Sequence, residues 1–238
     1  MGGYSEQHAE IYEDVLVSRG KDWAAEAELV SRLVREACGD AVSLLDVACG
    51  TGVHLESFRQ DFPDVAGVDA SRPMLDRAAA RLPGVPLHEG DMRDFDLGRT
   101  FDAVTCLFFA LSYMRGTADL RAATARMAAH LRPGGVLVAE PWWFPEQFLD
   151  GYVDGHLVRD EHRVITRVTH SVRDGGATRM EVRVTVAEPS GIREFREYEV
   201  VSLFTLDEYL AAFDEAGCDA RFLPGEPNAR GLFVAVRR

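Results

Sequence analysis

The chain has 238 residues, of which 47 % are hydrophobic, and its 26 Lys and Arg against 39 Asp and Glu give a net charge of −13. A chain of this length and composition buries a substantial core, which excludes disorder, and its acidic balance argues against a nucleic-acid partner. No apolar run reaches the roughly 20 residues that span a bilayer, and the N-terminus lacks the pattern of a signal peptide, so we expect a cytoplasmic protein without a membrane partner.

The first part of the chain predicts helices followed by alternating strands and helices. Residues 1–41 are predicted to be helical, because Leu29, Leu33 and Val34 recur at helical spacing. Apolar runs of strand length follow, separated by amphipathic stretches of helix length. Strands are expected at 42–48, 65–69, 86–88, 101–106 and 136–140, and helices at 73–81 and 118–131. This alternation predicts an α/β fold with a parallel, Rossmann-like sheet and helices on both faces.

After Pro141 the pattern changes to that of antiparallel strands. Residues 157–203 alternate between apolar and polar side chains and contain glycine turns, which predicts three or four antiparallel strands. A capping box at Thr205 and Glu208 then starts a helix, and a terminal hairpin completes the edge of the parallel sheet. We therefore expect one domain, 1–238, with N-terminal helices (1–41), a Rossmann-like core (42–141 and 204–238) and inserted antiparallel strands (142–203).

The cysteines and histidines predict no metal or redox site. Cys38, Cys49, Cys106 and Cys218 form no C-x-x-C pair, so each is expected to be a reduced, buried thiol. The histidines show no H-x-x-x-H spacing, and no metal is expected.

The most informative motif runs from Asp46 to Gly52, where the first predicted strand gives way to a helix. Gly50 and Gly52 allow a ligand to approach the backbone closely at the carboxyl edge of the sheet. The motif is not G-x-G-x-x-G, because position 55 is Leu55, and the chain lacks a P-loop. A phosphate-binding loop is therefore disfavoured.

Acidic residues end the next two predicted strands. The Asp69 carboxylate suits the two hydroxyls of a ribose, Asp91 could accept a hydrogen bond from an adenine amine, and Met92 could pack on the adenine face. Such a pocket fits a cofactor that has ribose, adenine and a sulfonium but no phosphates.

These residues resemble the class I S-adenosylmethionine-dependent methyltransferases. The resemblance implies S-adenosyl-L-methionine as cofactor and S-adenosyl-L-homocysteine as product. The cofactor-binding residues that it implies are Tyr12, Arg19, Asp46, Ala48, Gly50, Gly52, Asp69, Ala70, Asp91, Met92 and Leu107.

Over nearly its whole length the chain further resembles the dTDP-amino-deoxysugar N,N-dimethyltransferases of antibiotic biosynthesis. The most distinctive stretch is Glu140 to Glu146 (Glu-Pro-Trp-Trp-Phe-Pro-Glu), beside Gly20 to Asp22, Gly90 to Phe95 and Arg230 to Phe233. The resemblance implies N-methylation of the amino group of a dTDP-linked sugar in a natural-product pathway. It also implies a homodimer, for which the inserted strands offer a face; the alternative is that this sheet covers the active site.

The same resemblance implies acceptor-binding residues. Tyr4 would lie near the amine, and Trp142 and Trp143 would form a wall of the acceptor pocket. Arg230 would pair with the pyrophosphate, with Arg179 as a weaker candidate. The ordinary alternatives are a terminal tyrosine, a buried loop and solvated surface charges.

The chain departs from the sugar dimethyltransferases after the fourth strand. They carry a Ser-Ser-Ile-Gly-His stretch, whereas this chain has Phe109 to Tyr113. Tyr113 and Tyr4 become the candidate catalytic residues, and no single residue is expected to be an indispensable base. The departure leaves open the position of the amine and, as an alternative, a small-molecule methyltransferase that acts on another nitrogen, carbon or oxygen nucleophile. A cofactor-binding regulator without turnover is disfavoured by the acceptor-side residues.

Overall fold

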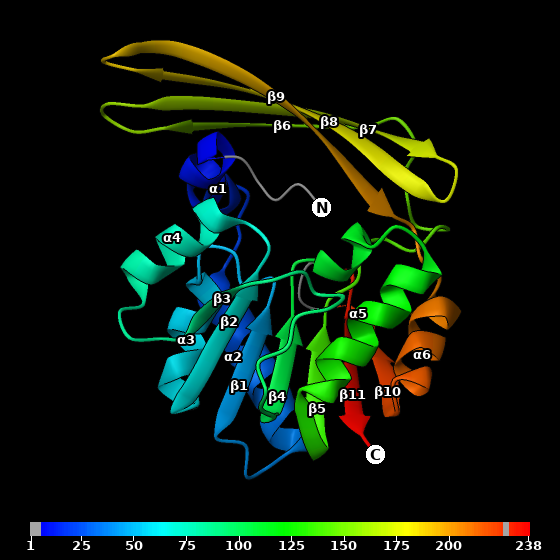
Figure 1. Ribbon diagram of the computed structural model, residues 1–238. Helices are drawn as coiled ribbons and strands as arrows, with labels where there is room; N and C mark the ends of the chain where they lie inside the picture. Colours follow the sequence, from blue (N-terminus) through cyan, green and yellow to red (C-terminus); the bar gives the residue numbers. More distant parts are fainter. Residues whose placement is uncertain (1–5, 226–228) are drawn as a thin grey trace.

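A computed structural model of the chain describes residues 6–225 and 229–238 (Figure 1). Its larger sheet is seven-stranded with the order β10-β11-β5-β4-β1-β2-β3. The strands are β1 (Ser43–Val47), β2 (Asp64–Asp69), β3 (Leu87–Glu89), β4 (Phe101–Cys106), β5 (Leu131–Ala139), β10 (Cys218–Leu223) and β11 (Leu232–Arg237). The first five are parallel, whereas β10 and β11 form the predicted antiparallel hairpin, with β11 against β5.

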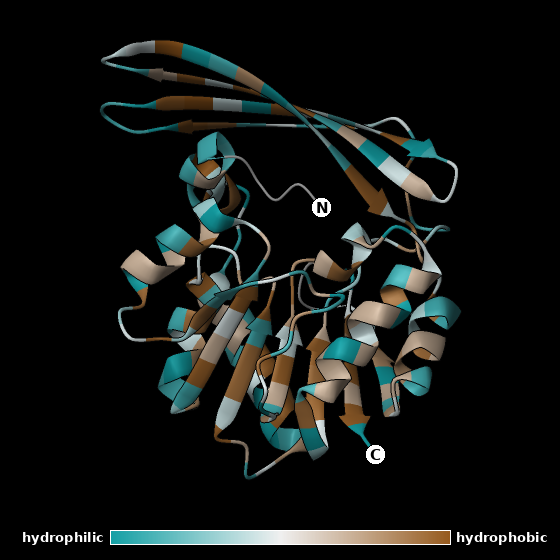
Figure 2. Cartoon of the chain, in the orientation of Figure 1, coloured by the Kyte–Doolittle hydropathy of each residue, from teal (hydrophilic) through white to brown (hydrophobic). Residues whose placement is uncertain are grey.

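Helices cover both faces of this sheet, because alternate strand residues point to opposite sides. Leu45 of β1 belongs to the core under α5 and α6, and its neighbour Leu44 belongs to the core under α2, α3 and α4. The helices are α1 (Glu6–Ser18), α2 (Trp23–Ala37), α3 (Val53–Asp61), α4 (Arg72–Arg81), α5 (Thr117–Ala129) and α6 (Leu206–Glu215), with a short 3-10 helix η1 (Ala110–Tyr113). Figure 2 shows hydrophobic colouring concentrated on the strands that these helices cover.

A separate four-stranded antiparallel sheet lies beyond the carboxyl ends of the parallel strands (Figure 1). Its strands, in the order β6-β7-β8-β9, are β6 (Tyr152–Arg159), β7 (Val164–Asp174), β8 (Ala177–Glu188) and β9 (Gly191–Ser202). The inner face carries Val182, Val184 and Val186, which pack against Ile11 and Val15 of α1. Thus α1 is held between the two sheets.

This architecture confirms the predicted fold class, a Rossmann-like sheet with an inserted antiparallel sheet. β6 begins at Tyr152, before residue 157, where the alternation predicts the antiparallel strands to start. Asp154 and Gly155 are poor strand formers, but full pairing with β7 overrides their propensity. All four cysteines are free and buried, as expected. In residues 6–225 and 229–238, no helix is long and apolar enough to cross a membrane.

Candidate active site

The turn after β1 needs glycine for two different reasons. Ala48, Gly50 and Gly52 all have left-handed backbone conformations, with φ of 60°, 56° and 78°. A Cβ at Gly52 would lie 2.8 Å from Leu82 and 3.1 Å from Ala78, so this glycine lets α3 pack on α4. A Cβ at Gly50 would meet nothing within 4 Å. Gly50 therefore faces open space, where a ligand can approach the backbone.

That open space is a cavity of about 480 Å³ at the carboxyl ends of β1 and β2, which we call the first cavity. It brings together most of the predicted cofactor residues from segments far apart in the sequence. Those that line it are Tyr12, Ala48, Gly50, Asp69, Ala70, Asp91, Met92 and Leu107. Asp46 lines a small adjoining recess, which also borders Gly50 and Leu107.

Asp69 is held in place by the backbone of two turns. Its carboxylate accepts hydrogen bonds from the amide of Gly50 at 2.8 Å and from the amide of Ser71 at 2.7 Å. Burial raises the pKa of this carboxyl above its ordinary value. A carboxylate offers about four lone-pair sites, so the Asp69 carboxylate can still accept from a ligand hydroxyl beside these backbone amides.

Asp91 is held by an arginine on its own turn. The guanidinium of Arg93 donates to both carboxylate oxygens, at 2.9 and 2.6 Å, and a second arm reaches Asp119 at 3.1 Å. This hydrogen bonding holds the pKa of Asp91 below its ordinary value. Asp91 is therefore a fixed carboxylate at the edge of the first cavity.

Buried hydrogen-bond donors surround the recess beside Asp46. The indole Nε1 of Trp23 and the hydroxyl of Thr51 are buried and have no hydrogen-bond partner within the described part of the chain. Such unpaired donors are costly unless a ligand satisfies them. Burial raises the pKa of Asp46 to about 6, although Thr105 donates to it at 2.7 Å. The recess thus offers a ligand two hydrogen-bond donors, from Trp23 and Thr51, next to the carboxyl group of Asp46.

A charged cluster supports this recess from α2. Burial acts to raise the pKa of Glu26, but the hydrogen bond from His54 at 3.1 Å and the ammonium of Lys21 at 2.5 Å outweigh it and bring that pKa to about 2. The Lys21 ammonium also lies 4.5 Å from the ring centroid of Phe108. The cluster fixes a cation and Trp23 beside the recess.

A second cavity, of about 360 Å³, lies between α1, the loop after β5 and the inner face of the antiparallel sheet. Trp142, Trp143 and Arg230 line it, together with Arg167, Thr169 and Ser171 of β7. Tyr12, Phe108 and Glu199 line both cavities. The two cavities therefore share a wall made by these three residues.

Arg230 is a largely shielded cation of the second cavity. It forms an ion pair with Glu140, and its guanidinium carbon lies 5.3 to 5.8 Å from the ring centroids of Phe109, Trp142 and Trp143. Its Nε is buried without a hydrogen-bond partner among the residues that the structure describes. Glu140 also accepts a hydrogen bond from the amide of Phe108 at 2.7 Å. One carboxylate thus positions both Arg230 and the shared wall.

The structure places several predicted site residues elsewhere. The resemblance implies that Arg19 binds the cofactor, but Arg19 lines the second cavity and pairs with Asp154 at 3.2 Å, because the turn after α1 points it toward β6. Arg179 is exposed on the outer face of β8, away from the second cavity. Its neighbours Thr178 and Met180 are buried on the inner face, and successive residues of a strand point to opposite faces. Tyr113 lines the first cavity, and its hydroxyl donates to Glu199 at 2.7 Å. Tyr4 lies outside the described residues.

Sequence reasoning missed four residues that line the two cavities and the recess. Phe108, Glu199, Arg167 and Trp23 were not among the candidates. No sequence signal marks Arg167, because its neighbours on the same face of β7 include Thr169 and Ser171, and only the fold shows that this face is buried. Glu199 lies on the edge strand β9, whose sequence mixes charged with apolar and aromatic side chains. In such a pattern, sequence alone does not distinguish a solvent-exposed carboxylate from one that lines a cavity.

Comparisons with known proteins identify the relatives of this chain. Residues 44–135 match the family described as methyltransferase domain. The chain is 56 % identical to dTDP-4-amino-2,3,4,6-tetradeoxy-D-glucose N,N-dimethyltransferase of Saccharopolyspora spinosa, over 98 % of this chain and 94 % of that protein. It is 52 % identical to dTDP-3-amino-3,4,6-trideoxy-alpha-D-glucopyranose N,N-dimethyltransferase of Streptomyces venezuelae, over 98 % of this chain and 99 % of that one.

Solved structures agree with these sequence relatives. Streptomyces venezuelae DesVI superposes with a TM-score of 0.94 at 52 % identity, covering 99 % of this chain and 100 % of that one. CalS10, an amino pentose methyltransferase from Micromonospora echinaspora solved with S-adenosylmethionine bound, gives a TM-score of 0.89 at 52 % identity, covering 100 % and 99 %. These similarities extend over both sheets.

Proposed function

Since the chain belongs to the S-adenosylmethionine-dependent dTDP-amino-sugar N,N-dimethyltransferases, we propose that it dimethylates the amino group of a dTDP-linked amino-deoxysugar in antibiotic biosynthesis. The observation that carries this proposal is the wall of Tyr12, Phe108 and Glu199 between the two cavities. One cavity has acids suited to ribose and adenine, and the other has buried arginines suited to phosphate. We place the methyl transfer at this wall, where the two cavities meet.

The residues of the first cavity fit S-adenosyl-L-methionine. Asp69 would hold the ribose hydroxyls, with Asp91 and Met92 at the adenine. The unpaired donors of Trp23 and Thr51 would satisfy the carboxylate of the methionyl end. When bound, this cofactor supplies a methyl group on an already activated sulfonium.

The second cavity fits the nucleotide-sugar. We assign the pyrophosphate to Arg230, whose unpaired Nε–H is available for a phosphate oxygen. Arg167, on the inner face of β7, takes the role of the second cation that the resemblance gave to Arg179. Thr169 and Ser171 of the same strand add hydroxyls beside it, and Trp142 and Trp143 form the aromatic wall.

The chain catalyses this transfer by alignment and exclusion of water. Phe108, Phe109 and Trp142 pack in series with ring centroids 4.5 Å apart, which makes one side of the shared wall apolar. Holding the amine and the methyl donor in line at this wall supplies most of the acceleration, because the leaving group is already activated. The amine loses its proton to water before it attacks, and we assign no dedicated base.

Turnover of defined substrates tests the proposal. The named activities of two relatives place the amine at position 4 in one sugar and at position 3 in the other. We expect mass spectrometry to show mono- and dimethylated products from at least one sugar in a panel of dTDP-3-amino and dTDP-4-amino sugars. Binding of S-adenosyl-L-homocysteine without turnover of any panel member would instead favour the alternative, a small-molecule methyltransferase for another nitrogen, carbon or oxygen nucleophile.

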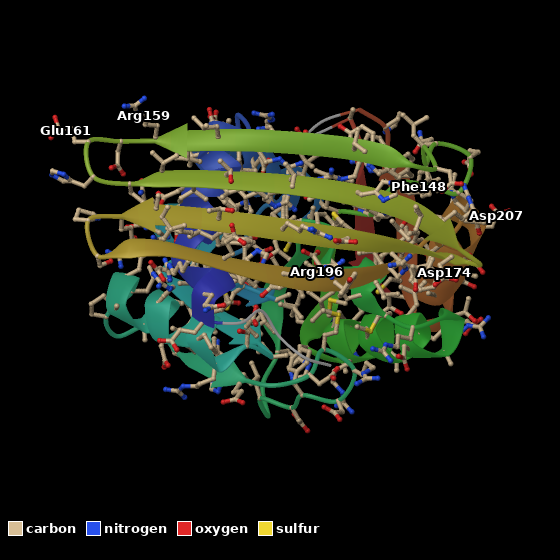
Figure 3. The ribbon with its side chains drawn as sticks, turned by 90° about the horizontal axis from the view of Figure 1, so that it is seen from above. Phe148, Arg159, Glu161, Asp174, Arg196 and Asp207 are labelled. Carbon is tan, nitrogen blue, oxygen red and sulfur yellow. The ribbon has the colours of Figure 1, made fainter. Side chains whose placement is uncertain are left out.

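We further propose that two copies associate through the outer face of the antiparallel sheet, seen from above in Figure 3, where Arg196 lies on this face. Large apolar side chains are exposed on its strands: Val153, Leu157, Val168, Ile192 and Tyr198. Exposed apolar side chains gathered on one face are typical of an interaction surface. We also propose that the reaction takes place in the cytoplasm.

A further inference from the structure

Glu199 occupies a position that no predicted role explains. It lies on the inner face of the edge strand β9, and its cross-strand neighbour on that face is Met180. It lines both cavities, and the hydroxyl of Tyr113 donates to its carboxylate at 2.7 Å. It is therefore the carboxylate of the shared wall.

The other residues of the shared wall, Tyr12 and Phe108, carry no negative charge that could bind an amine in place of Glu199. Burial raises the pKa of the Tyr12 hydroxyl, and the nearby carboxylates of Asp69 and Glu199 raise it further, so Tyr12 stays neutral. Phe108 is apolar, and Glu140 is engaged by Arg230 and by the amide of Phe108. Among Tyr12, Phe108 and Glu199, Glu199 is thus the residue whose carboxylate can accept a charge-assisted hydrogen bond from an amine, and it also lines the cavity of the methyl donor.

We propose that Glu199 anchors the acceptor amine, accepting an N–H hydrogen bond that turns the nitrogen lone pair toward the first cavity. This inference rests on the proposed function, since it names the group that recognises the amine of the sugar. Tyr113 acts as a positioning residue, because its hydroxyl fixes the carboxylate from the side of the first cavity. Arg230 and Glu199 then hold opposite ends of the acceptor.

The anchor serves both methyl transfers. The bound ammonium first loses a proton to water, leaving a neutral amine with a lone pair. That lone pair forms the new N–C bond while the C–S bond breaks and its electron pair moves to sulfur, which becomes a thioether. The resulting ammonium again loses a proton to water. A primary amine and a secondary amine both keep at least one N–H for Glu199 while presenting a lone pair.

The same geometry explains why transfer stops after two methyl groups. A neutral tertiary amine has a lone pair but no N–H, so Glu199 no longer orients it. A protonated tertiary amine has an N–H but no lone pair, so it can bind and cannot attack. Only primary and secondary amines are anchored and reactive at once.

The experiment compares Glu199→Gln and Glu199→Met with the wild type by isothermal titration and single-turnover mass spectrometry. Both variants remove the charge of the acceptor and Glu199→Met also removes the hydrogen bond, so the affinity for the dTDP-amino-sugar should fall about 10- to 100-fold, with Glu199→Met the weaker binder. The affinities for dTDP alone and for S-adenosyl-L-homocysteine should stay within about threefold, and the first and second transfers should slow by similar factors. Glu194→Gln, on the exposed face of the same strand, is the matched control and should behave as wild type.

Tyr113→Phe gives an independent readout, since it leaves the carboxylate in place. It should weaken amino-sugar binding less than Glu199→Met does, again with dTDP binding unchanged. Unchanged amino-sugar affinity in both Glu199 variants would overturn the inference, as would an equal loss of dTDP affinity, which indicates a general structural defect. Failure of the proposed function is distinguishable, because then the wild type itself turns over no dTDP-amino-sugar.

Discussion

At the scale of single residues, Glu140 links stability to the site. Its side chain is 1 % exposed and that of its partner Arg230 is 10 % exposed, so both charges are shielded from water. Glu140 also fixes the amide of Phe108. The φ of Phe108 is 51°, a left-handed backbone conformation that residues other than glycine rarely adopt. The pair thus holds a strained turn and the cation of the second cavity in one arrangement.

Removing the charge of Glu140 should therefore destabilise the protein strongly. In Glu140→Gln the buried guanidinium loses its counter-ion, and the free energy of unfolding should fall by about 3 kcal/mol, measured by urea denaturation. The control is Glu28→Gln, because Glu28 is 81 % exposed and lies 4.0 Å from Arg32. That exposed pair should contribute no more than about 0.5 kcal/mol. Equal losses in the two variants would contradict this account of Glu140.

The placement of residues shows what sequence can and cannot predict here. Gly50 and Asp69 were predictable because Gly50 follows a strand and Asp69 ends the next one, and parallel strands bring their carboxyl ends to one edge. Arg167 and Arg179 were not separable, since both stand in alternating strands and a shift of one residue reverses the faces. Tyr113 and Glu199 are 86 positions apart in the sequence, and only the folded antiparallel sheet brings them together.

At the scale of elements, local sequence patterns predicted most of the helices and strands. Apolar runs indicated β1, β4 and β5, and the capping box at Thr205 and Glu208 is present at the start of α6. The position of α1 could not be predicted from these patterns, because its burial depends on a sheet formed more than a hundred residues later. The division of the chain at residues 41, 141 and 203 stays a prediction.

Because α1 contributes Tyr12 to both cavities, its attachment to the antiparallel sheet should control ligand binding. Ile11 is 2 % exposed against that sheet, and Ile11→Ala should cost about 2 to 4 kcal/mol of local stability. We expect faster amide hydrogen exchange in α1, with β4 and β5 still protected, and weaker binding of S-adenosyl-L-homocysteine. Val17→Ala on the same helix is the control, since Val17 is 57 % exposed. Unchanged exchange in α1 of the Ile11 variant would argue against this role.

At the scale of the whole molecule, the protein is acidic although its second cavity is lined by arginines. The net charge of −13 argues against a polyanionic partner. The second cavity is nevertheless lined by Arg167, which is buried on the inner face of β7, and by Arg230, which is largely shielded from water. We therefore expect a dianionic nucleotide-sugar to bind inside the molecule, where Arg167 and Arg230 are shielded from solvent and from the field of the surface.

The common wall of the two cavities should make the two ligands bind cooperatively. A nucleotide on Arg230 acts through Glu140 on the amide of Phe108, and Phe108 also lines the first cavity. A ligand that orders this wall reduces the entropy cost for the second ligand. We expect S-adenosyl-L-homocysteine to raise the affinity for dTDP about fivefold or more in isothermal titration. Linkage requires dTDP to raise the affinity for S-adenosyl-L-homocysteine by the same factor, and a factor of one in both directions would show that the wall does not couple the two sites.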